Sequence, residues 1–194
     1  MSSRSRNRAI AASCVVAALT MAGLLASQSV QAQNPYQTQI TSPADLRLAQ
    51  ATAARLIEAS SMVADLDPSL VADQAQLDSS QFKDEMAARV RAVYSDSQFE
   101  ENFDIALSAA QLIHDEQTFK PYERVTMSIG EWHGATLNSA DGTVTSTFRG
   151  ALTFHFADHD FKEPSYDWSV VTTGLDTSTT KAKLVSYVAA EIRE

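Results

Sequence analysis

The chain has 194 residues, 44% of them hydrophobic and 20% charged, which suits one globular domain and excludes collagen-like, disordered and polytopic membrane proteins. Residues 1–32 contain three arginines and no acid, so the remaining 162 residues carry 12 basic and 24 acidic side chains and a net charge of −12. This excess of carboxylates argues against nucleic acid or an anionic membrane surface as a partner. No motif indicates a resident cofactor.

The first 32 residues are typical of an export signal. Three spaced arginines precede an uncharged, mostly apolar segment at 9–26, and the small residues of VQA at 30–32 suit a signal peptidase. We expect cleavage after Ala32 and a secreted or extracytoplasmic protein. An uncleaved apolar segment of this length just spans a hydrocarbon core of about 30 Å, so an anchored protein is the alternative. The single cysteine, Cys14, lies in this segment, so the mature chain has no thiol for disulfides or metal sites.

Residues 33–41 are polar and predict a flexible leader, and residues 42–194 predict a single α+β domain. The first helix is expected to begin at Ser42, because a serine followed by proline and, three positions on, an acid is typical of a helix start. The stripe that follows at steps of three or four is small or apolar: Ala49, Ala53, Leu56, Ser60 and Val63. Asp67-Pro68 ends this helix.

Two further helices are predicted from capping pairs, a polar residue followed three positions later by an acid or amide. The second helix is expected to begin at Asp78 and to end at Tyr94. The third is expected to begin at Ser97 and to end near Thr118, before a proline. The connector 69–79 is polar, with one short helical turn as an option.

After the third helix the apolar period changes from about 3.6 to 2, which predicts strands. Four are expected in series, near 125–130, 144–156, 166–172 and 182–192, although the last is also compatible with a helix. Gly150 interrupts the apolar face of the second strand and predicts a bend or a close approach to the backbone. The elements predict an α+β fold of three N-terminal helices packed on one face of a curved four-stranded antiparallel sheet.

This order of elements resembles the NTF2-like (cystatin-like α+β) superfamily, particularly its exported or membrane-anchored bacterial members of the VirB8-like and Mce-associated type. The resemblance covers residues 42–194 and rests on the helix block, the long strand GTVTSTFRGALTFHF and the tryptophan-bearing strand YDWSV at 166–170. It implies a cone-shaped cavity between helices and sheet, which some relatives use for isomerase or dehydratase chemistry and others only for binding or assembly.

Six residues are candidates for such a pocket or for an interface: Trp132, His133, His155, Tyr166, Trp168 and Tyr187. Imidazoles titrate near neutrality and can move a proton, and large rings supply contact area with a polar handle. Strand alternation directs His155 away from the apolar face, so a structural or solvent-facing role is the simpler interpretation. The segment HFADHD at 155–160 predicts a polar hairpin and no metal site, because its histidines are about 13 Å apart along a strand.

The sequence contains no phosphate loop, dinucleotide fingerprint, zinc-protease helix or nucleophile elbow. We therefore expect an exported, non-catalytic binding or assembly module without a cofactor. Its partner would be a protein or a small apolar ligand, with a homodimer as an open alternative, and a membrane only if the leader is retained. The alternative hypothesis is a cofactor-free pocket enzyme of the isomerase, dehydratase or cyclase type that uses His133 or His155.

Overall fold

The computed structural model describes residues 35–63, 65–116, 121–176 and 181–192. The predicted export signal and the predicted helix end near Thr118 lie outside these residues. Within the described ranges, none of the helices combines the length and the apolarity that crossing a membrane requires.

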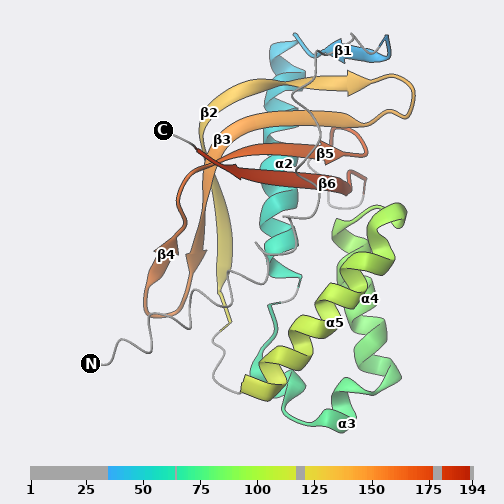
Figure 1. Ribbon diagram of the computed structural model, residues 1–194, viewed down its shortest axis with the longest axis vertical. Helices are drawn as coiled ribbons and strands as arrows, with labels where there is room; N and C mark the ends of the chain where they lie inside the picture. The colour runs from blue at the N-terminus through green and yellow to red at the C-terminus, as the bar shows by residue number, and fades with distance from the viewer. Residues whose placement is uncertain (1–34, 64, 117–120, 177–180, 193–194) are drawn as a thin grey trace. The chain divides into compact units, whose positions relative to one another are not determined.

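The predicted α+β class is confirmed, but the described residues form four α-helices and six strands instead of three and four (Figure 1). In chain order the elements are β1 (Gln37–Gln39), α2 (Pro43–Met62), the 3-10 turn η2 (Pro68–Val71), α3 (Gln74–Leu77), α4 (Ser80–Val93), the 3-10 turn η3 (Asp96–Gln98), α5 (Phe99–Glu116), β2 (Arg124–Asn138), β3 (Val144–His155), β4 (Asp160–Lys162), β5 (Tyr166–Thr172) and β6 (Leu184–Glu191). The sheet is antiparallel in the order β1-β2-β3-β5-β6, and β4 pairs with β3.

Helix starts differ from the sequence prediction wherever a short turn precedes the helix. The start of α2 is as predicted, since the Ser42 hydroxyl accepts a hydrogen bond from the Asp45 N–H at 3.5 Å. Asp78 closes α3, so the cap of α4 passes to Ser79, whose hydroxyl accepts from the Phe82 N–H at 3.2 Å. Ser97 lies inside the turn η3, and α5 begins only after it.

The strands are more numerous than the alternation of apolar residues predicts, and one of them is longer. β2 continues well beyond residue 130. The sequence does not predict this continuation, because register shifts between Ile129 and Glu131 and between Trp132 and Gly134 interrupt the period of two that makes a strand recognisable. β1 lies within the segment expected as a leader and pairs with the end of β2. The segment 182–192, for which the sequence allows a strand or a helix, contains the strand β6.

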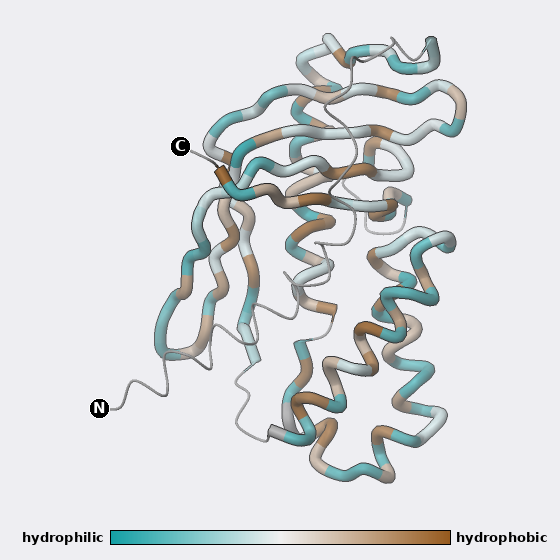
Figure 2. The backbone as a smooth tube through the Cα atoms, in the orientation of Figure 1, coloured by the Kyte–Doolittle hydropathy of each residue, from teal (hydrophilic) through white to brown (hydrophobic). Residues whose placement is uncertain are grey.

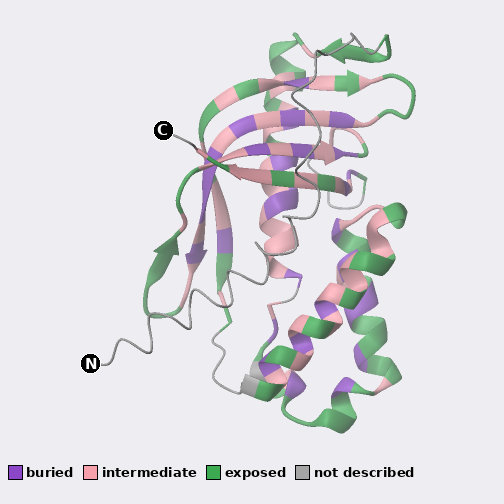
Figure 3. Ribbon diagram, viewed as in Figure 1, coloured by how far each residue is buried: buried purple, intermediate pink, exposed green. Residues whose placement is uncertain are grey.

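One large cluster of buried residues joins α2, α4 and α5 to one face of the sheet. Figure 2 shows apolar residues recurring along α2, α4 and α5, and Figure 3 shows buried residues recurring along β3 and β5. Leu56 of α2 and Phe148 of β3 are both fully buried in one cluster. This face of the sheet, called the helix-facing side below, is where the core sits, and the opposite side is called the outer face.

Helix α2 runs antiparallel to β2. Near its start Ala49 packs with Ala135, and near its end the Glu58 carboxylate accepts a hydrogen bond from the Met127 N–H at 2.6 Å. After the helix, the Asp65 carboxylate accepts from the Tyr122 N–H at 3.1 and 3.2 Å. Glu58 thus satisfies a backbone donor on β2, and Asp65 one just before β2, ahead of the point at which β1 pairs with this strand.

The α4 and α5 helices pack against each other and reach the sheet at β6. The Ser95 N–H donates to the Leu184 carbonyl at 2.9 Å, and Tyr94 forms a parallel bridge with Leu184. The Lys183 ammonium donates to the carbonyls of Arg91 and Ala92 at 2.8 and 2.9 Å, where the end of a helix dipole favours a cation. The beginning of β6 is therefore the anchor of this helical pair.

Gly150 is a position of close backbone approach, as the sequence predicts. A Cβ there would lie 2.8 Å from the Ser128 carbonyl oxygen and 3.2 Å from the Met127 sulfur. The Trp168 indole N–H donates to the Gly150 carbonyl at 3.1 Å, so the same residue also fixes a buried aromatic ring.

We expect Gly150→Ala to lower the free energy of unfolding by about 1–3 kcal/mol, because the added methyl group forces strand backbone apart. Urea denaturation measures the change. Gly130→Ala is the matched control, since its Cβ would meet the nearest atom at 3.9 Å. Equal losses in the two variants would contradict the close approach at Gly150.

Candidate functional site

Four large rings stack across the helix-facing side of the sheet and form an aromatic row: Trp132, Phe148, Trp168 and Tyr187. Successive ring centroids are 5.9, 6.4 and 6.1 Å apart, and the first two pairs are stacked with interplanar angles of 13°. Cross-strand pairing positions the first three, because Trp132 pairs with Phe148, which pairs with Trp168. Tyr166 meets Trp168 edge-on at 6.3 Å.

The ends of the aromatic row are less buried than its centre. Phe148 and Trp168 are buried in the core, whereas Trp132, Tyr166 and Tyr187 pack against the core but stay partly exposed. The structure therefore brings together the four aromatic members of the predicted site and leaves three of them, Trp132, Tyr166 and Tyr187, partly exposed.

A register shift turns Tyr187 toward this side. Val171 pairs with Ser186 and Thr172 with Leu184, so Val185 is passed over and the alternation of β6 changes phase. Tyr187 then packs against the core, while Val188 beside it is 37% exposed.

Three side chains, of Thr52, Arg55 and Trp132, have buried donor atoms without a hydrogen-bond partner among the described residues. The atoms are the Thr52 hydroxyl oxygen, Nε and Nη1 of Arg55, and Nε1 of Trp132. Thr52 is fully buried. Burial lowers the pKa of Arg55, and the nearby Asp176 carboxylate partly opposes this shift. Buried donors are normally paired, so this group needs an explanation.

A second group of titratable residues surrounds the end of α2. Burial raises the pKa of Asp65 to about 6, and the hydrogen bond from the Tyr122 N–H and the charge of Arg89 oppose the shift. Burial also raises the pKa of Tyr122 to about 12, with a contribution from Asp65 and Glu163. The pKa of Glu163 is itself raised by burial. These groups favour their uncharged forms more than they would in water.

Ser60 of α2 acts on the phenols of both Tyr94 and Tyr187. Burial raises the pKa of each phenol, and the nearby Ser60 hydroxyl partly opposes the shift. Ser60 in turn donates to the Ile57 carbonyl at 2.8 Å. This serine, which the sequence places on the stripe of α2, joins the helix to α4 and β6.

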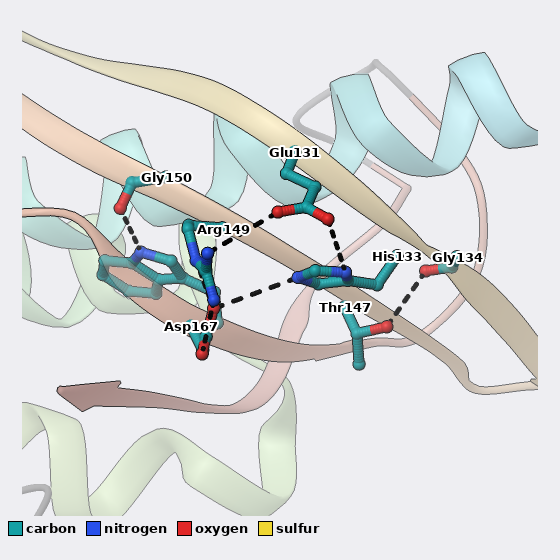
Figure 4. A network of polar contacts seen from close by, with 8 residues as sticks. Glu131, His133, Gly134, Thr147, Arg149, Gly150 and Asp167 are labelled. Carbon is teal, nitrogen blue, oxygen red and sulfur yellow. Dashed lines mark hydrogen bonds and ion pairs between the residues drawn. The ribbon is translucent and has the colours of Figure 1, made fainter. Parts of the chain in front are cut away.

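His133 lies on the outer face, away from the aromatic row (Figure 4). It occupies the second register shift of β2, and its ring nitrogens are 3.9 Å from carboxylate oxygens of Glu131 and Asp167. Arg149 donates to Asp167 from Nε at 2.9 Å and lies 3.6 Å from Glu131. The hydrogen bond from Arg149 is the main reason that the pKa of Asp167 is lowered. Such exposed ion pairs contribute little stability.

His155 also lies on the outer face, opposite Phe154, as strand alternation predicts. Its Nε2 is 2.9 Å from the Thr126 hydroxyl oxygen and its Nδ1 is 2.9 Å from a carboxylate oxygen of Asp160. The His155 side chain is 16% exposed and that of Asp160 is 62% exposed. The imidazole is therefore held between a hydroxyl and a carboxylate.

The two histidines of HFADHD have separate partners. His159 Nδ1 is 2.8 Å from an Asp158 carboxylate oxygen, and its ring stacks on Phe156 at 4.7 Å. In the described ranges, no three His, Cys, Asp or Glu side chains are arranged to hold a metal ion.

Thr52, Arg55, Thr126 and Asp65 were not among the candidates that the sequence suggests. Thr52 had a signal, because it lies three residues after Ala49 on the buried stripe of α2, where a polar side chain is unusual. The sequence gives no such signal for Arg55 and Thr126, since their partners come from segments distant in sequence.

No family model, curated protein or solved structure matches this chain, so its function is argued from geometry.

Asp65 gives a pH-dependent prediction. Its pKa in the folded protein, about 6, exceeds the ordinary value of 3.8, so the folded state keeps this proton after the unfolded state has lost it. The contribution of Asp65 to stability therefore decreases as pH rises from about 4 to 6 and is least favourable above 6. Asp65→Asn removes the charge and keeps an oxygen for the Tyr122 N–H.

We expect Asp65→Asn to be more stable than the parent at pH 7.5 by about 1–2 kcal/mol, a value reduced from the full shift because the carboxyl is partly exposed. At pH 4 the two proteins should unfold at similar urea concentrations. Asp67→Asn is the control of opposite sign, because hydrogen bonds from Ser69 lower the pKa of Asp67. A loss of stability in Asp65→Asn at pH 7.5 would contradict the assignment.

Proposed function

We propose that this chain is an exported binding module that holds a small apolar ligand against the aromatic row. The observation that carries the proposal is the partial exposure of Trp132, Tyr166 and Tyr187 on the side of the sheet that also supplies the core. Aromatic rings with a polar atom provide a large contact area at little conformational cost, and their partial exposure leaves that area available. No catalytic residue is assigned to this side.

Export and family membership are part of the same proposal. The arginines before the apolar segment 9–26 support an exported protein, cleaved after Ala32. The long helix against an antiparallel sheet supports membership of the NTF2-like superfamily in its VirB8-like or Mce-associated branch. The net charge of −12 after residue 32 supports a partner other than nucleic acid.

The experiment uses the full chain, expressed in an exporting host and purified from outside the cytoplasm. We expect the N-terminus at Gln33 and saturable binding of Nile red, an uncharged apolar dye. Tyr187→Ala should weaken dye binding about tenfold, since loss of one aromatic contact amounts to about 1–2 kcal/mol. Val188→Ala is the matched control, because the neighbouring side chain lies on the exposed side.

Two results would contradict the proposal. One is the absence of dye binding by a folded monomer. The other is a dimer, detected by light scattering, that excludes the dye until it is diluted, because the aromatic row would then be an interface between two copies.

A second candidate function, acyl transfer, is favoured by Thr126, His155 and Asp160. A hydroxyl, an imidazole and a carboxylate joined at 2.9 and 2.9 Å have the spacing of a nucleophile, its base and the group that orients the base. His155 would take the Thr126 proton as the hydroxyl oxygen bonds to an ester carbon, and would return it to the departing alkoxide. Water would then release the acid from Thr126.

A fluorophosphonate probe tests this second function directly. If Thr126 is a nucleophile, the probe adds to it with loss of fluoride, and mass spectrometry places the adduct on the peptide that contains Thr126. Thr126→Val should abolish labelling, whereas Thr153→Val, the cross-strand neighbour, should not. An unlabelled parent protein would identify the three residues as a structural hydrogen-bond network.

A further inference from the structure

We infer that the aromatic row ends at a carboxylate-binding site formed by Thr52, Arg55 and Trp132, so that the ligand is an organic acid with an apolar body. The inference rests on the proposed function and specifies its ligand. Its evidence is the position of three buried sets of donor atoms that have no partner among the described residues.

The antiparallel course of α2 and β2 brings these residues to the same level. Ala49 packs with Ala135, and Glu58 bonds to the Met127 N–H. The intervening part of α2 contains Thr52 and Arg55, and the intervening part of β2 contains Trp132. Trp132 packs against the small cluster that contains Ala49, so it lies against the turn of α2 that precedes Thr52.

Arg55 is directed to the same place from the next turn. Thr52 and Arg55 are three residues apart, which places them on one face of the helix, and long side chains on a helix extend back toward its N-terminus. One hydrogen bond of Arg55 is formed by Nη2 with the Asp176 carbonyl at 3.4 Å. Leu175, next to Asp176, packs in the same small cluster as Trp132.

Every unpartnered atom of this group can donate a hydrogen bond. Two nitrogens of a guanidinium, an indole N–H and a hydroxyl together match a group with two acceptor oxygens, and a hydrogen bond from a charged donor to a carboxylate is stronger than one between neutral groups. Burying two guanidinium nitrogens without an acceptor is costly, so a bound anion would replace the hydrogen bonds to water that these nitrogens lose on folding.

The local charge favours a single negative charge on the ligand. Asp176 is the acid whose field acts on Arg55, and its carboxylate is 3.7 Å from the Lys181 ammonium. Of these three charged side chains, two are cationic and one is anionic. Ile40, Leu46 and Leu175 are apolar members of the small cluster against which Trp132 packs. A hydrated phosphate with two charges suits such surroundings poorly, and a carboxylate on an apolar body suits them well.

Calorimetric titration of the purified exported chain with dodecanoate and with dodecanol tests the inference. The two probes share an apolar body and differ in the carboxylate. We expect dodecanoate to bind at least tenfold more tightly than dodecanol at pH 7.5. Arg55→Met, which keeps an apolar stem, should abolish this preference and leave dodecanol binding unchanged. Arg47→Met is the matched control, since Arg47 is an exposed arginine of the same helix and should keep the preference.

Thermal unfolding without ligand separates a binding role from a structural one. If Arg55 serves the ligand, Arg55→Met should unfold at the same or a higher temperature than the parent, because two buried nitrogens without an acceptor have been removed. If Arg55→Met is instead unstable, Thr52→Val tests the carboxylate site in its place. This substitution replaces the hydroxyl with a methyl group of similar size. It should weaken dodecanoate binding several-fold without changing dodecanol binding.

The outcomes distinguish this inference from the proposed function. Equal binding of the two probes, unchanged by Arg55→Met and Thr52→Val, would overturn the carboxylate site and leave the apolar binding face in place. No binding of either probe, together with no binding of Nile red, would overturn both.

Discussion

The structure depends on the contact between α2 and β2. A strand with one unpaired side exposes backbone donors, and here Glu58 accepts a hydrogen bond from the Met127 N–H of β2, while Asp65 accepts one from the Tyr122 N–H just before the strand. Because hydrogen bonds are short and directional, these two constrain the position of the helix as well as stabilise it. They fix α2 along β2, and this alignment determines which helical side chains face Trp132.

The sheet separates two kinds of chemistry onto its two faces. Consecutive residues point to opposite sides, so Trp132 joins the aromatic row and His133 the ion pairs of the outer face. Phe154 and His155 are divided in the same way. An apolar ligand on the helix-facing side would therefore meet no imidazole from these strands. For this reason binding is proposed on one face, and the second candidate, which uses His155, on the other.

Local signals in the sequence were sufficient for some elements and not for others. Ser42 marks the start of α2, because a helix cap is formed by residues that are neighbours in the sequence. Gly150 marks a close approach of the β2 backbone, because it is the one position without a side chain on the apolar face of β3. β2 was predicted too short because its register shifts remove the alternation that identifies a strand. β1 was not predicted because its pairing is supplied by a distant strand. The environment of Arg55 was beyond prediction for the same reason, since its neighbours come from β2 and from the segment after β5.

The proposed ligand site and the stability of the domain are linked. The described residues include no cysteine and so no disulfide that could offset costly groups, yet they bury two guanidinium nitrogens of Arg55 and the hydroxyl of Thr52 without a partner. Groups of this kind destabilise the free protein and are satisfied only when an acceptor arrives. A ligand that binds the folded state alone then stabilises it in proportion to its concentration over its dissociation constant. The residues that destabilise the free protein are therefore those whose hydrogen bonds to a ligand would stabilise the bound form.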